Sequence, residues 1–199
     1  MLRINNLSKR FEDKEVIKDL SLFFPERGFV AICGPSGCGK STLLHIIAGI
    51  ENCDAGEVIL DNATVSMSFQ EPRLLSERTA LQNVNLVLGD KKTTLGEAEE
   101  LLRELGINDV CLYPNELSGG MKARVSIARA LAKKADIYLF DEPFANLDKD
   151  TAEMTANVIK MRAADALVIA VVHDREFAEK IADSLILFSQ APITGNFII

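Results

Sequence analysis

Short, continuous apolar runs alternate along this chain with segments of helical period, a pattern that predicts an α/β fold. The clearest runs lie at residues 29–33, 135–140 and 167–172, where nearly every position is apolar. Runs of this kind are typical of strands that are buried on both faces. A last strand is predicted at residues 185–188. The helices predicted around these strands cover residues 42–48, residues 174–182 and a segment after Asp148 with its core face at Met154, Val158 and Met161.

Other segments indicate a smaller sheet. Two strands near the start are predicted at residues 2–5 and 20–24. Residues 57–60 and 63–69 alternate between apolar and polar side chains, as a half-buried strand does. Asp61 and Asn62 lie between them as a turn signal, so we predict a hairpin there. We expect these strands to form a small antiparallel subdomain.

From about residue 76 to residue 134 the period becomes that of helices, which predicts a helical subdomain. The capping boxes predicted within it are Thr79-x-x-Gln82 and Thr94-x-x-Glu97. An apolar stripe follows the second box and ends at Gly106, a residue type that commonly terminates helices. The stripe consists of Leu95, Ala98, Leu101, Leu102 and Leu105.

A glycine-rich loop follows the run at residues 29–33 and matches the P-loop pattern G-x-x-x-x-G-K-S. Strand, loop and helix occur in the order that this motif requires. The glycines allow backbone N–H groups to converge on phosphate oxygens at the positive end of a helix. Lys40 is expected to contact the β- and γ-phosphates, and the Ser41 hydroxyl to bind Mg²⁺. The nucleotide-binding positions predicted here are Gly34, Pro35, Ser36, Gly37, Cys38, Gly39, Lys40, Ser41 and Thr42.

The apolar run at residues 135–140 ends abruptly at two carboxylates, Asp141 and Glu142. A carboxylate at the end of a buried strand beside the P-loop strand is suited to hold Mg²⁺, and we assign this role to Asp141. Glu142 points to the other face of the strand end, where it can polarise the attacking water as a general base. GTPases of the Ras kind use a glutamine for that task, so the acidic pair favours ATP hydrolysis.

Composition excludes several other classes of function. The chain has 199 residues, of which 48% are apolar and 26% charged, the usual mix of a globular domain. Its net charge of −7, its aromatic content of 6% and its lack of tryptophan argue against a nucleic-acid surface. The longest strongly apolar run, residues 166–172, is far shorter than a membrane helix. The first residues lack the apolar core of a signal peptide.

The cysteines have no spacing that indicates a metal site. They are Cys33, Cys38, Cys53 and Cys111. Without an export signal, reduced thiols are expected. Cys38 differs from the others because it belongs to the P-loop, so we expect it to lie against bound nucleotide and to be shielded by it.

A second glycine-rich segment, Leu-Ser-Gly-Gly, precedes another predicted helix at residues 121–133. Ser118 is placed to cap this helix, and Gly119 and Gly120 open its first turn to a ligand. The segment lies about twenty residues before the acidic pair. In sequence and position it resembles the signature of the ATP-binding-cassette (ABC) ATPases, whose other motifs follow in the family's order along nearly the whole chain.

The resemblance implies roles for further residues. Phe11 matches the aromatic residue that stacks on adenine in this family, and Val16 matches a side chain packed near the nucleotide. Gln70 matches the Q-loop glutamine, which touches Mg²⁺ and the lytic water, and His173 matches the switch histidine at the γ-phosphate. Asp148 matches the D-loop residue that contacts a partner subunit, and it is also placed to cap the helix that follows it.

An ABC site is completed by two chains, so the resemblance implies a head-to-tail homodimer that sandwiches ATP. Ser118 and Gly120 of one subunit would contact the γ-phosphate held by Lys40 of the other. ATP would close the dimer and hydrolysis would reopen it. In transporters this motion drives integral membrane permease subunits, which would place the chain on the cytoplasmic face of the membrane as a peripheral subunit. A solute-binding protein is a further expected partner, and nucleic acid is not.

The segments around Gln70, Ser118 and Glu142 resemble the nitrate, sulfonate and taurine importer ATPases, which implies import of a small anionic or similar solute. An ABC ATPase of an exporter, a lipoprotein-extraction complex or a cell-division complex stays an alternative. The acidic balance disfavours a soluble ABC machine acting on nucleic acid, and intact Glu142 and His173 disfavour a module that does not hydrolyse ATP. We expect residues 1–199 to form a single ABC ATPase domain: a P-loop NTPase core, the small antiparallel β subdomain, and the helical subdomain inserted at about residues 76–134.

Overall fold

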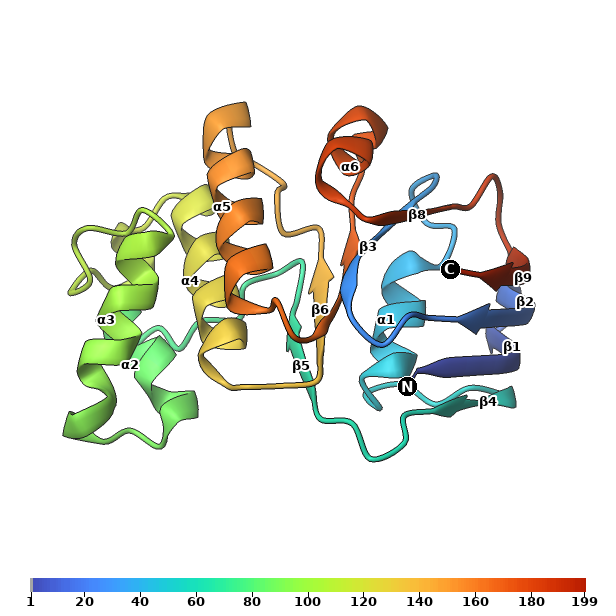
Figure 1. The fold of residues 1–199 in the computed structure, drawn as a ribbon, viewed down its shortest axis with the longest axis horizontal. Helices are drawn as coiled ribbons and strands as arrows, with labels where there is room; N and C mark the ends of the chain where they lie inside the picture. Colours follow the sequence, from blue (N-terminus) through green and yellow to red (C-terminus); the bar gives the residue numbers. More distant parts are fainter. Residues whose placement is uncertain (1) are drawn as a thin grey trace.

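Two sheets and a helical part make up the protein, for which a computed structural model describes residues 2–199. Figure 1 shows the sheets side by side, with the helical part on the side away from the smaller sheet. The larger sheet has the strand order β5-β6-β7-β3-β8, and neighbouring strands in it are parallel. Its strands are β3 (Gly28–Cys33), β5 (Val65–Ser68), β6 (Ile137–Asp141), β7 (Leu167–Val171) and β8 (Ser184–Leu187). The strands predicted from the continuous apolar runs are thereby confirmed.

Side chains alternate along the parallel strands and separate the interior into two apolar layers. Ala31 and Phe140 pack in the layer that holds α4, α5 and α6, whereas Ile32 and Leu139 pack in the layer that holds α1 and the smaller sheet. The helices of these layers are α1 (Lys40–Ile47), α4 (Gly119–Ala132), α5 (Lys149–Arg162) and α6 (Arg175–Ile181). Because both faces of the sheet are covered, its central strands β6, β7 and β3 are apolar at nearly every position.

The smaller sheet has the strand order β4-β1-β2-β9. Its strands are β1 (Arg3–Phe11), β2 (Lys14–Phe23), β4 (Ala55–Ile59) and β9 (Ile193–Ile198). β1 is antiparallel to both of its neighbours, as predicted for this subdomain, whereas β9 runs parallel to β2. β9 was not predicted from the sequence, and it brings the end of the chain back to the sheet that contains its start (Figure 1).

The hairpin predicted within residues 57–69 is wrong. β4 pairs with β1 in the smaller sheet, while β5 pairs with β6 in the larger one. The chain turns at Asp61 and Asn62, whose φ angles of 45° and 64° are positive, and crosses from one sheet to the other. The Asp136 carboxylate anchors the crossing, since it accepts hydrogen bonds from the Thr64 amide and hydroxyl at 2.8 and 2.7 Å. The turn signal was therefore correct, but the pairing was not.

The helical part lies between β5 and β6 in the sequence. It comprises α2 (Ala80–Asn85), α3 (Leu95–Glu104) and α4, with 3₁₀ turns at Leu86–Leu88, Lys92–Thr94 and Pro114–Glu116. The first predicted capping box is confirmed, because the Thr79 hydroxyl accepts from the Gln82 amide and the Gln82 side chain accepts from the Thr79 amide. The second is wrong. The Thr94 hydroxyl instead donates to the Asn85 side chain at 2.5 Å and to the Lys91 carbonyl at 2.9 Å.

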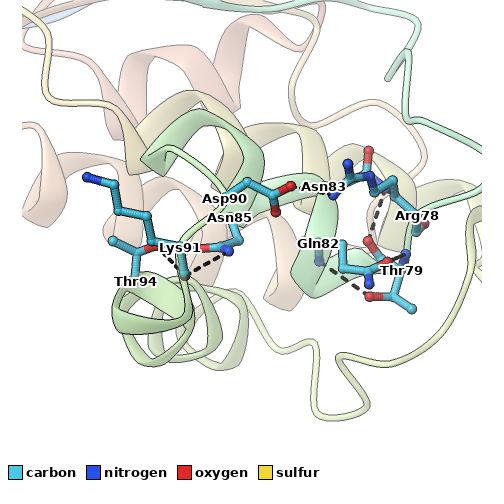
Figure 2. A network of polar contacts seen from close by, with 8 residues as sticks. All are labelled: Arg78, Thr79, Gln82, Asn83, Asn85, Asp90, Lys91 and Thr94. Atoms are coloured by element: carbon cyan, nitrogen blue, oxygen red, sulfur yellow. Dashed lines mark hydrogen bonds and ion pairs between the residues drawn. The ribbon is translucent and has the colours of Figure 1, made fainter.

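Buried asparagines fix the loops of the helical part, as Figure 2 shows. Asn83 is fully buried, and its Oδ1 accepts from the Leu75 amide at 2.8 Å. Its Nδ2 donates to the carbonyl oxygens of Leu75, Arg78 and Thr79. Asn85 is 3% exposed and donates to the Lys91 carbonyl at 3.1 Å. The segments before and after α2 are thus held in defined shapes by side chains inside the helical part.

The helices are apolar along one face rather than all round. Leu101 and Leu102 of α3 are buried, in agreement with the predicted apolar stripe. Val158 of α5 is buried as expected, but Met161 is 60% exposed, so its assignment to the core is wrong. No helix within residues 2–199 combines the length and the apolar character that a membrane span needs.

Candidate active site

The candidate residues gather at one edge of the parallel sheet, where the strands reach their C-terminal ends. β3 leads into the P-loop and α1, and β6 ends at Asp141. Gln70 comes two residues after the end of β5, and His173 two residues after the end of β7. Because parallel strands end at the same edge, segments far apart in the sequence surround the P-loop, the usual place for a ligand in such a sheet.

The P-loop contains glycines at positions where the fold leaves no room for a side chain. Gly39 has a φ of 118°, and a Cβ there would lie 2.8 Å from the carbonyl oxygen of Val16 in β2. A Cβ at Gly34 would lie 2.8 Å from the carbonyl oxygen of Phe188, just beyond β8. The loop is thus packed between the two sheets, and glycine is required at both positions.

Lys40 is the first residue of α1 and is 5% exposed. Its ammonium donates to the carbonyl oxygens of Gly34 and Pro35, both at 2.8 Å. These bonds hold the side chain across the loop that it belongs to. An ammonium is a compact point charge with three donors, which suits it to bind phosphate oxygens at this place.

Ser41 and Asp141 form a candidate metal-binding pair. The Ser41 hydroxyl donates to Asp141 Oδ1 at 3.0 Å, although the two residues are 100 positions apart. Burial raises the pKa of the Asp141 carboxyl above its usual value, while the hydrogen bond from Ser41 opposes that rise. Mg²⁺ prefers oxygen ligands and usually takes one or two from the protein, with water and phosphate oxygens completing its shell. A hydroxyl and a carboxylate therefore fit this cation.

The Glu142 carboxylate connects two other candidates. Its Oε1 lies 2.6 Å from His173 Nε2, and its Oε2 accepts a hydrogen bond from Gln70 Nε2 at 3.1 Å. The backbone of Glu142 has a φ of 52°, a conformation that is strained for any residue other than glycine and that recurs at functional sites. The carboxylate is thus held at both oxygens, which fixes its orientation as a candidate general base.

Except for Asp141, these side chains line one pocket of about 340 Å³, a volume in the range of small-molecule sites. The pocket joins the middle of the P-loop to Gln70, Glu142 and His173. Val16, which the family resemblance places near the nucleotide, lines it too. The full lining is Val16, Ser36, Gly37, Gly39, Lys40, Ser41, Thr42, Gln70, Glu142 and His173.

Other predicted residues lie outside this pocket. Gly34, Pro35 and Cys38 do not line it, although they belong to the same loop. The Cys38 side chain is 1% exposed and packs into the apolar layer beneath the loop, so the protein itself already covers this thiol, and its shielding by nucleotide stays a prediction. Phe11 ends β1 opposite Lys14 of β2 and does not line the pocket; it is 43% exposed, and its stacking on adenine stays a prediction.

The signature segment does not line the pocket of its own chain. Ser118 caps α4 as predicted, because its hydroxyl accepts from the Met121 amide at 3.2 Å. A Cβ at Gly119 would meet nothing within 4 Å, whereas one at Gly120 would lie 2.9 Å from the Leu147 side chain. The signature therefore packs against the D-loop on one side and is open on the other.

Asp148 caps α5, one of the two roles predicted for it. Its carboxylate accepts from the Thr151 amide at 2.9 Å and from the Thr151 hydroxyl at 2.7 Å. These hydrogen bonds lower the pKa of the Asp148 carboxyl below its usual value. The residue is exposed and lies outside the pocket, so its contact with a second subunit stays a prediction.

A family model described as ABC transporter matches residues 17–145, which include the P-loop, the signature and the acidic pair. The chain belongs to the ABC transporter family. It is 35% identical over 220 residues to the arginine transport ATP-binding protein ArtM of Bacillus subtilis (strain 168), covering 98% of this chain and 90% of that protein. It is 39% identical over 202 residues to the aliphatic sulfonates import ATP-binding protein SsuB 2 of Agrobacterium fabrum (strain C58 / ATCC 33970), covering 96% and 77%.

Solved structures agree with this ABC family membership. The dimeric structure of MJ0796, a bacterial ABC transporter cassette, matches with a TM-score of 0.87 at 30% identity, over 95% of this chain and 94% of that one. The same cassette in a post-hydrolysis state with ADP and Pi matches with a TM-score of 0.85 at 30% identity, over 96% and 95%. The expected P-loop NTPase fold is confirmed, and the chain is an ATP-binding ABC ATPase.

Some contacts of this ABC subunit had no signal in the sequence. Arg129 of α4 donates to the carbonyl oxygens of Pro72 and Arg73, just after Gln70, at 2.8 and 2.9 Å. Arg124 of the same helix donates to the Leu105 carbonyl at 2.7 Å. Burial lowers the pKa of both guanidinium groups, which stay charged because that pKa is normally so high. Contacts across such sequence distances leave no local pattern, so periodicity cannot reveal them.

Proposed function

We propose that this chain is the ATP-hydrolysing subunit of an ABC importer and acts as one of two subunits that enclose ATP. The observation that carries the proposal is the pocket of about 340 Å³ that joins Lys40 to Glu142 and His173. The pocket therefore places a loop that binds phosphates and a carboxylate that activates water around the same substrate. Belonging to the ABC family makes that substrate ATP.

Each residue has a defined part in hydrolysis. Lys40 and the P-loop amides bind the β- and γ-phosphates and neutralise their charge. Glu142 accepts the proton of the water that attacks the γ-phosphorus, and the bond to the leaving ADP breaks. His173 donates to Glu142 at 2.6 Å, so it orients the base and lies where the γ-phosphate would bind. Gln70 orients the same carboxylate from the other side.

Mg²⁺ is the cofactor that the site fits. Ser41 and Asp141 would hold it, since their oxygens lie 3.0 Å apart beside the P-loop. Gln70 uses its Nε2 to donate to Glu142, which leaves its amide oxygen as a further ligand. Bound Mg²⁺ would neutralise charge that develops between the β- and γ-phosphates.

The second subunit would be another copy of this chain. Ser118, Gly119 and Gly120 lie outside the pocket of their own chain, and the Gly119 side is open. A head-to-tail pair related by a two-fold axis would bring each open signature to the partner's P-loop. The dimeric cassettes among the structural relatives support this arrangement. ATP would then favour the closed dimer, and hydrolysis would release it.

Import of a small solute is supported by the relatives. Their names give transport of arginine, glutamine, aliphatic sulfonates and sulfate or thiosulfate. A small anionic or similar solute would suit the sulfonate and sulfate branches. The choice of solute would lie with the permease and with a solute-binding protein, because the pocket in this chain serves ATP.

Permease subunits would dock on the helical part. Leu75, Leu86 and Val87 are exposed there, at 36%, 38% and 38%. They flank α2 in the sequence, and Asn83 holds the Leu75 backbone at its amide and its carbonyl. A rigid apolar surface beside the Q-loop would let permease contacts reach Gln70. The chain would then be peripheral, on the cytoplasmic face of the membrane.

Phosphate release from Mg-ATP tests the proposed chemistry. The wild-type chain should release phosphate, and Lys40→Ala should not, because the γ-phosphate loses its cation. Lys14→Ala, an exposed lysine at the start of β2, is the matched control and should keep wild-type activity. Equal release by Lys40→Ala and the wild type would contradict the proposal.

A further inference from the structure

Lys9 is a cation held inside the smaller sheet, outside the residues that line the ATP pocket. It belongs to β1, and its side chain is 9% exposed. Its ammonium lies 2.7 Å from Glu51 Oε1, 2.7 Å from the Asn52 carbonyl oxygen and 3.5 Å from Asp54 Oδ1. The hydrogen bond to Glu51 raises the pKa of Lys9, so the group stays charged. All three partners belong to the segment that leaves α1, the P-loop helix.

The segment after α1, residues 51–54, is itself held by hydrogen bonds, so its partners fix the position of the Lys9 ammonium. The Glu51 amide donates to the His45 carbonyl of α1 at 3.2 Å. The Asp54 amide donates to the Ser8 carbonyl at 2.9 Å, and Asp54 Oδ2 accepts from the Arg10 amide at 2.6 Å. The backbone on both sides of Lys9 is therefore hydrogen-bonded to the segment that follows α1.

The same ammonium lies 4.9 Å from the centroid of the Phe11 ring. A cation within about 6 Å of a ring centroid is attracted to the aromatic face. The pairing of β1 with β2 shifts its register between Lys9 and Arg10, an irregularity of the kind that redirects side chains. Phe11 is 43% exposed, so Lys9 is the fixed charged neighbour of a ring that is otherwise largely open to solvent.

We propose that Lys9 is a positioning residue for the nucleobase of ATP, holding the Phe11 ring in place and tying it to the exit of the P-loop helix. The proposal rests on the proposed function and on the role that the family resemblance implies for Phe11, stacking on adenine. Because the ammonium orders the ring in advance, less conformational freedom is lost when a base stacks on it. Because the same ammonium binds the segment after α1, the ring and the phosphate loop keep one spacing.

Three consequences separate this role from general support of the fold. Lys9 acts on the base and not on the phosphates, so a ligand without a base is insensitive to it. It acts through Phe11, so its effect disappears when the ring is removed. It acts through charge, so Arg at the same position retains most of the effect. If Lys9 only supported the fold, replacing it would weaken the binding of every ligand, whether or not the Phe11 ring is present.

The test is calorimetric titration of the full chain with two probes, MgADP and magnesium pyrophosphate. Lys9→Met keeps the aliphatic stem and removes the charge. We expect it to weaken ADP binding about two- to fivefold, the effect of one cation–π contact at a partly exposed site, and to leave pyrophosphate binding unchanged. Lys9→Arg should bind ADP nearly as the wild type does. Lys18→Met, an exposed lysine of β2 paired with Glu15, is the matched control.

The second part of the test repeats the Lys9→Met substitution in a chain that also carries Phe11→Ala. Phe11→Ala alone should weaken ADP binding roughly tenfold, because base stacking on the ring is lost. Adding Lys9→Met should then change nothing. The proposal is overturned if Lys9→Met leaves ADP affinity unchanged, weakens pyrophosphate as much as ADP, or acts equally without the ring.

Failure of the proposed function has a different signature. If Phe11→Ala binds ADP as tightly as the wild type, the stacking assigned to Phe11 is wrong, and the role of Lys9 falls with it. If the wild-type chain binds no ADP, the proposed function itself is wrong. If Phe11→Ala weakens ADP binding and Lys9→Met does not, only the inference about Lys9 is wrong.

Discussion

Two helices of this chain begin at glycine-rich segments, and the two starts are built in opposite ways. At α1 the loop is enclosed: a Cβ at Gly39 would lie 2.8 Å from a β2 carbonyl oxygen, and Lys40 is 5% exposed. At α4 the start is open, since a Cβ at Gly119 would meet nothing within 4 Å. The Ser118 hydroxyl caps its own helix there. The enclosed start forms a pocket within one chain, and the open start does not.

The difference shows how an ATPase site can be divided between two surfaces of one chain. Lys40, Gln70, Glu142 and His173, proposed for hydrolysis, line the pocket at the enclosed start, and the signature residues do not. Gly120 packs on Leu147, so the open start is coupled to the D-loop rather than to its own P-loop. We infer that the open start is shaped for the nucleotide of a second copy.

Replacing Glu142 gives the largest expected effect at the enclosed start. Glu142→Gln keeps the shape of the side chain but removes the base, so turnover should fall at least about 100-fold. ATP affinity should stay near wild type, because Lys40 and the P-loop are unchanged. ATP should also accumulate in a closed dimer, which size-exclusion chromatography with ATP would detect.

Glu99→Gln is the matched control for this prediction. Glu99 lies in α3 and pairs with Arg103 on the surface, away from the pocket. It should leave turnover and dimerisation unchanged. Hydrolysis by Glu142→Gln at the wild-type rate would show that another group removes the proton.

Alanine at the two glycine-rich starts should act on different properties. Gly39→Ala should weaken ADP binding by more than tenfold and lower the free energy of unfolding by about 1–2 kcal/mol, because its φ of 118° is strained with a Cβ. Gly119→Ala should leave unfolding and ADP binding nearly unchanged, since a Cβ there has open space. It should still lower ATP hydrolysis by crowding the partner's nucleotide. Chemical denaturation, ADP titration and turnover measure the three effects.

One outcome of these measurements would remove the distinction between the start of α1 and the start of α4. If Gly119→Ala weakens ADP binding as much as Gly39→Ala does, the signature contacts the nucleotide of its own chain. The open start would then need another explanation.

The smallest effect is expected at the cap of α5, beside the open start. Hydrogen bonds from Thr151 lower the pKa of Asp148, so its stabilising effect is present above the unfolded pKa and is lost as pH falls through the folded pKa. Asp148→Ala should therefore lower the melting temperature at pH 7, and the difference should shrink in acid. Asp150→Ala, at the next exposed aspartate of α5, should show a smaller change. A difference for Asp148→Ala that does not depend on pH would contradict this account.

The sequence predicted best those features that depend on local chemistry. The P-loop and the acidic pair were readable because their residue types and spacing are fixed by phosphate and metal binding. The central strands of the parallel sheet, β6, β7 and β3, were readable because both of their faces are covered. Residues 63–69 were wrongly paired with residues 57–60 in a hairpin. Alternation of apolar and polar side chains predicts a strand, but it does not show which strand is its partner.

The features that the sequence did not predict depend on contacts between distant segments of the chain or on the direction in which a side chain points. β9 has no periodic signal, and only its pairing with β2 makes it a strand. Thr94 fits the capping-box pattern, but it is the last residue of the 3₁₀ turn Lys92–Thr94, and its hydroxyl donates back to the Lys91 carbonyl. Cys38 belongs to the P-loop, yet its side chain points into the core. The partners of Lys9 lie more than forty residues away, where no local pattern reaches them.

Mixing two inactive variants tests the division of the site most directly. Lys40→Ala lacks the phosphate lysine, and Ser118→Arg blocks the signature, so each alone should not hydrolyse ATP. In a mixed dimer, the intact P-loop of Ser118→Arg meets the intact signature of Lys40→Ala. An equimolar mixture should therefore recover about a quarter of wild-type activity, because half of random two-fold dimers are mixed and each has one intact site. A mixture as inactive as its components would contradict the account.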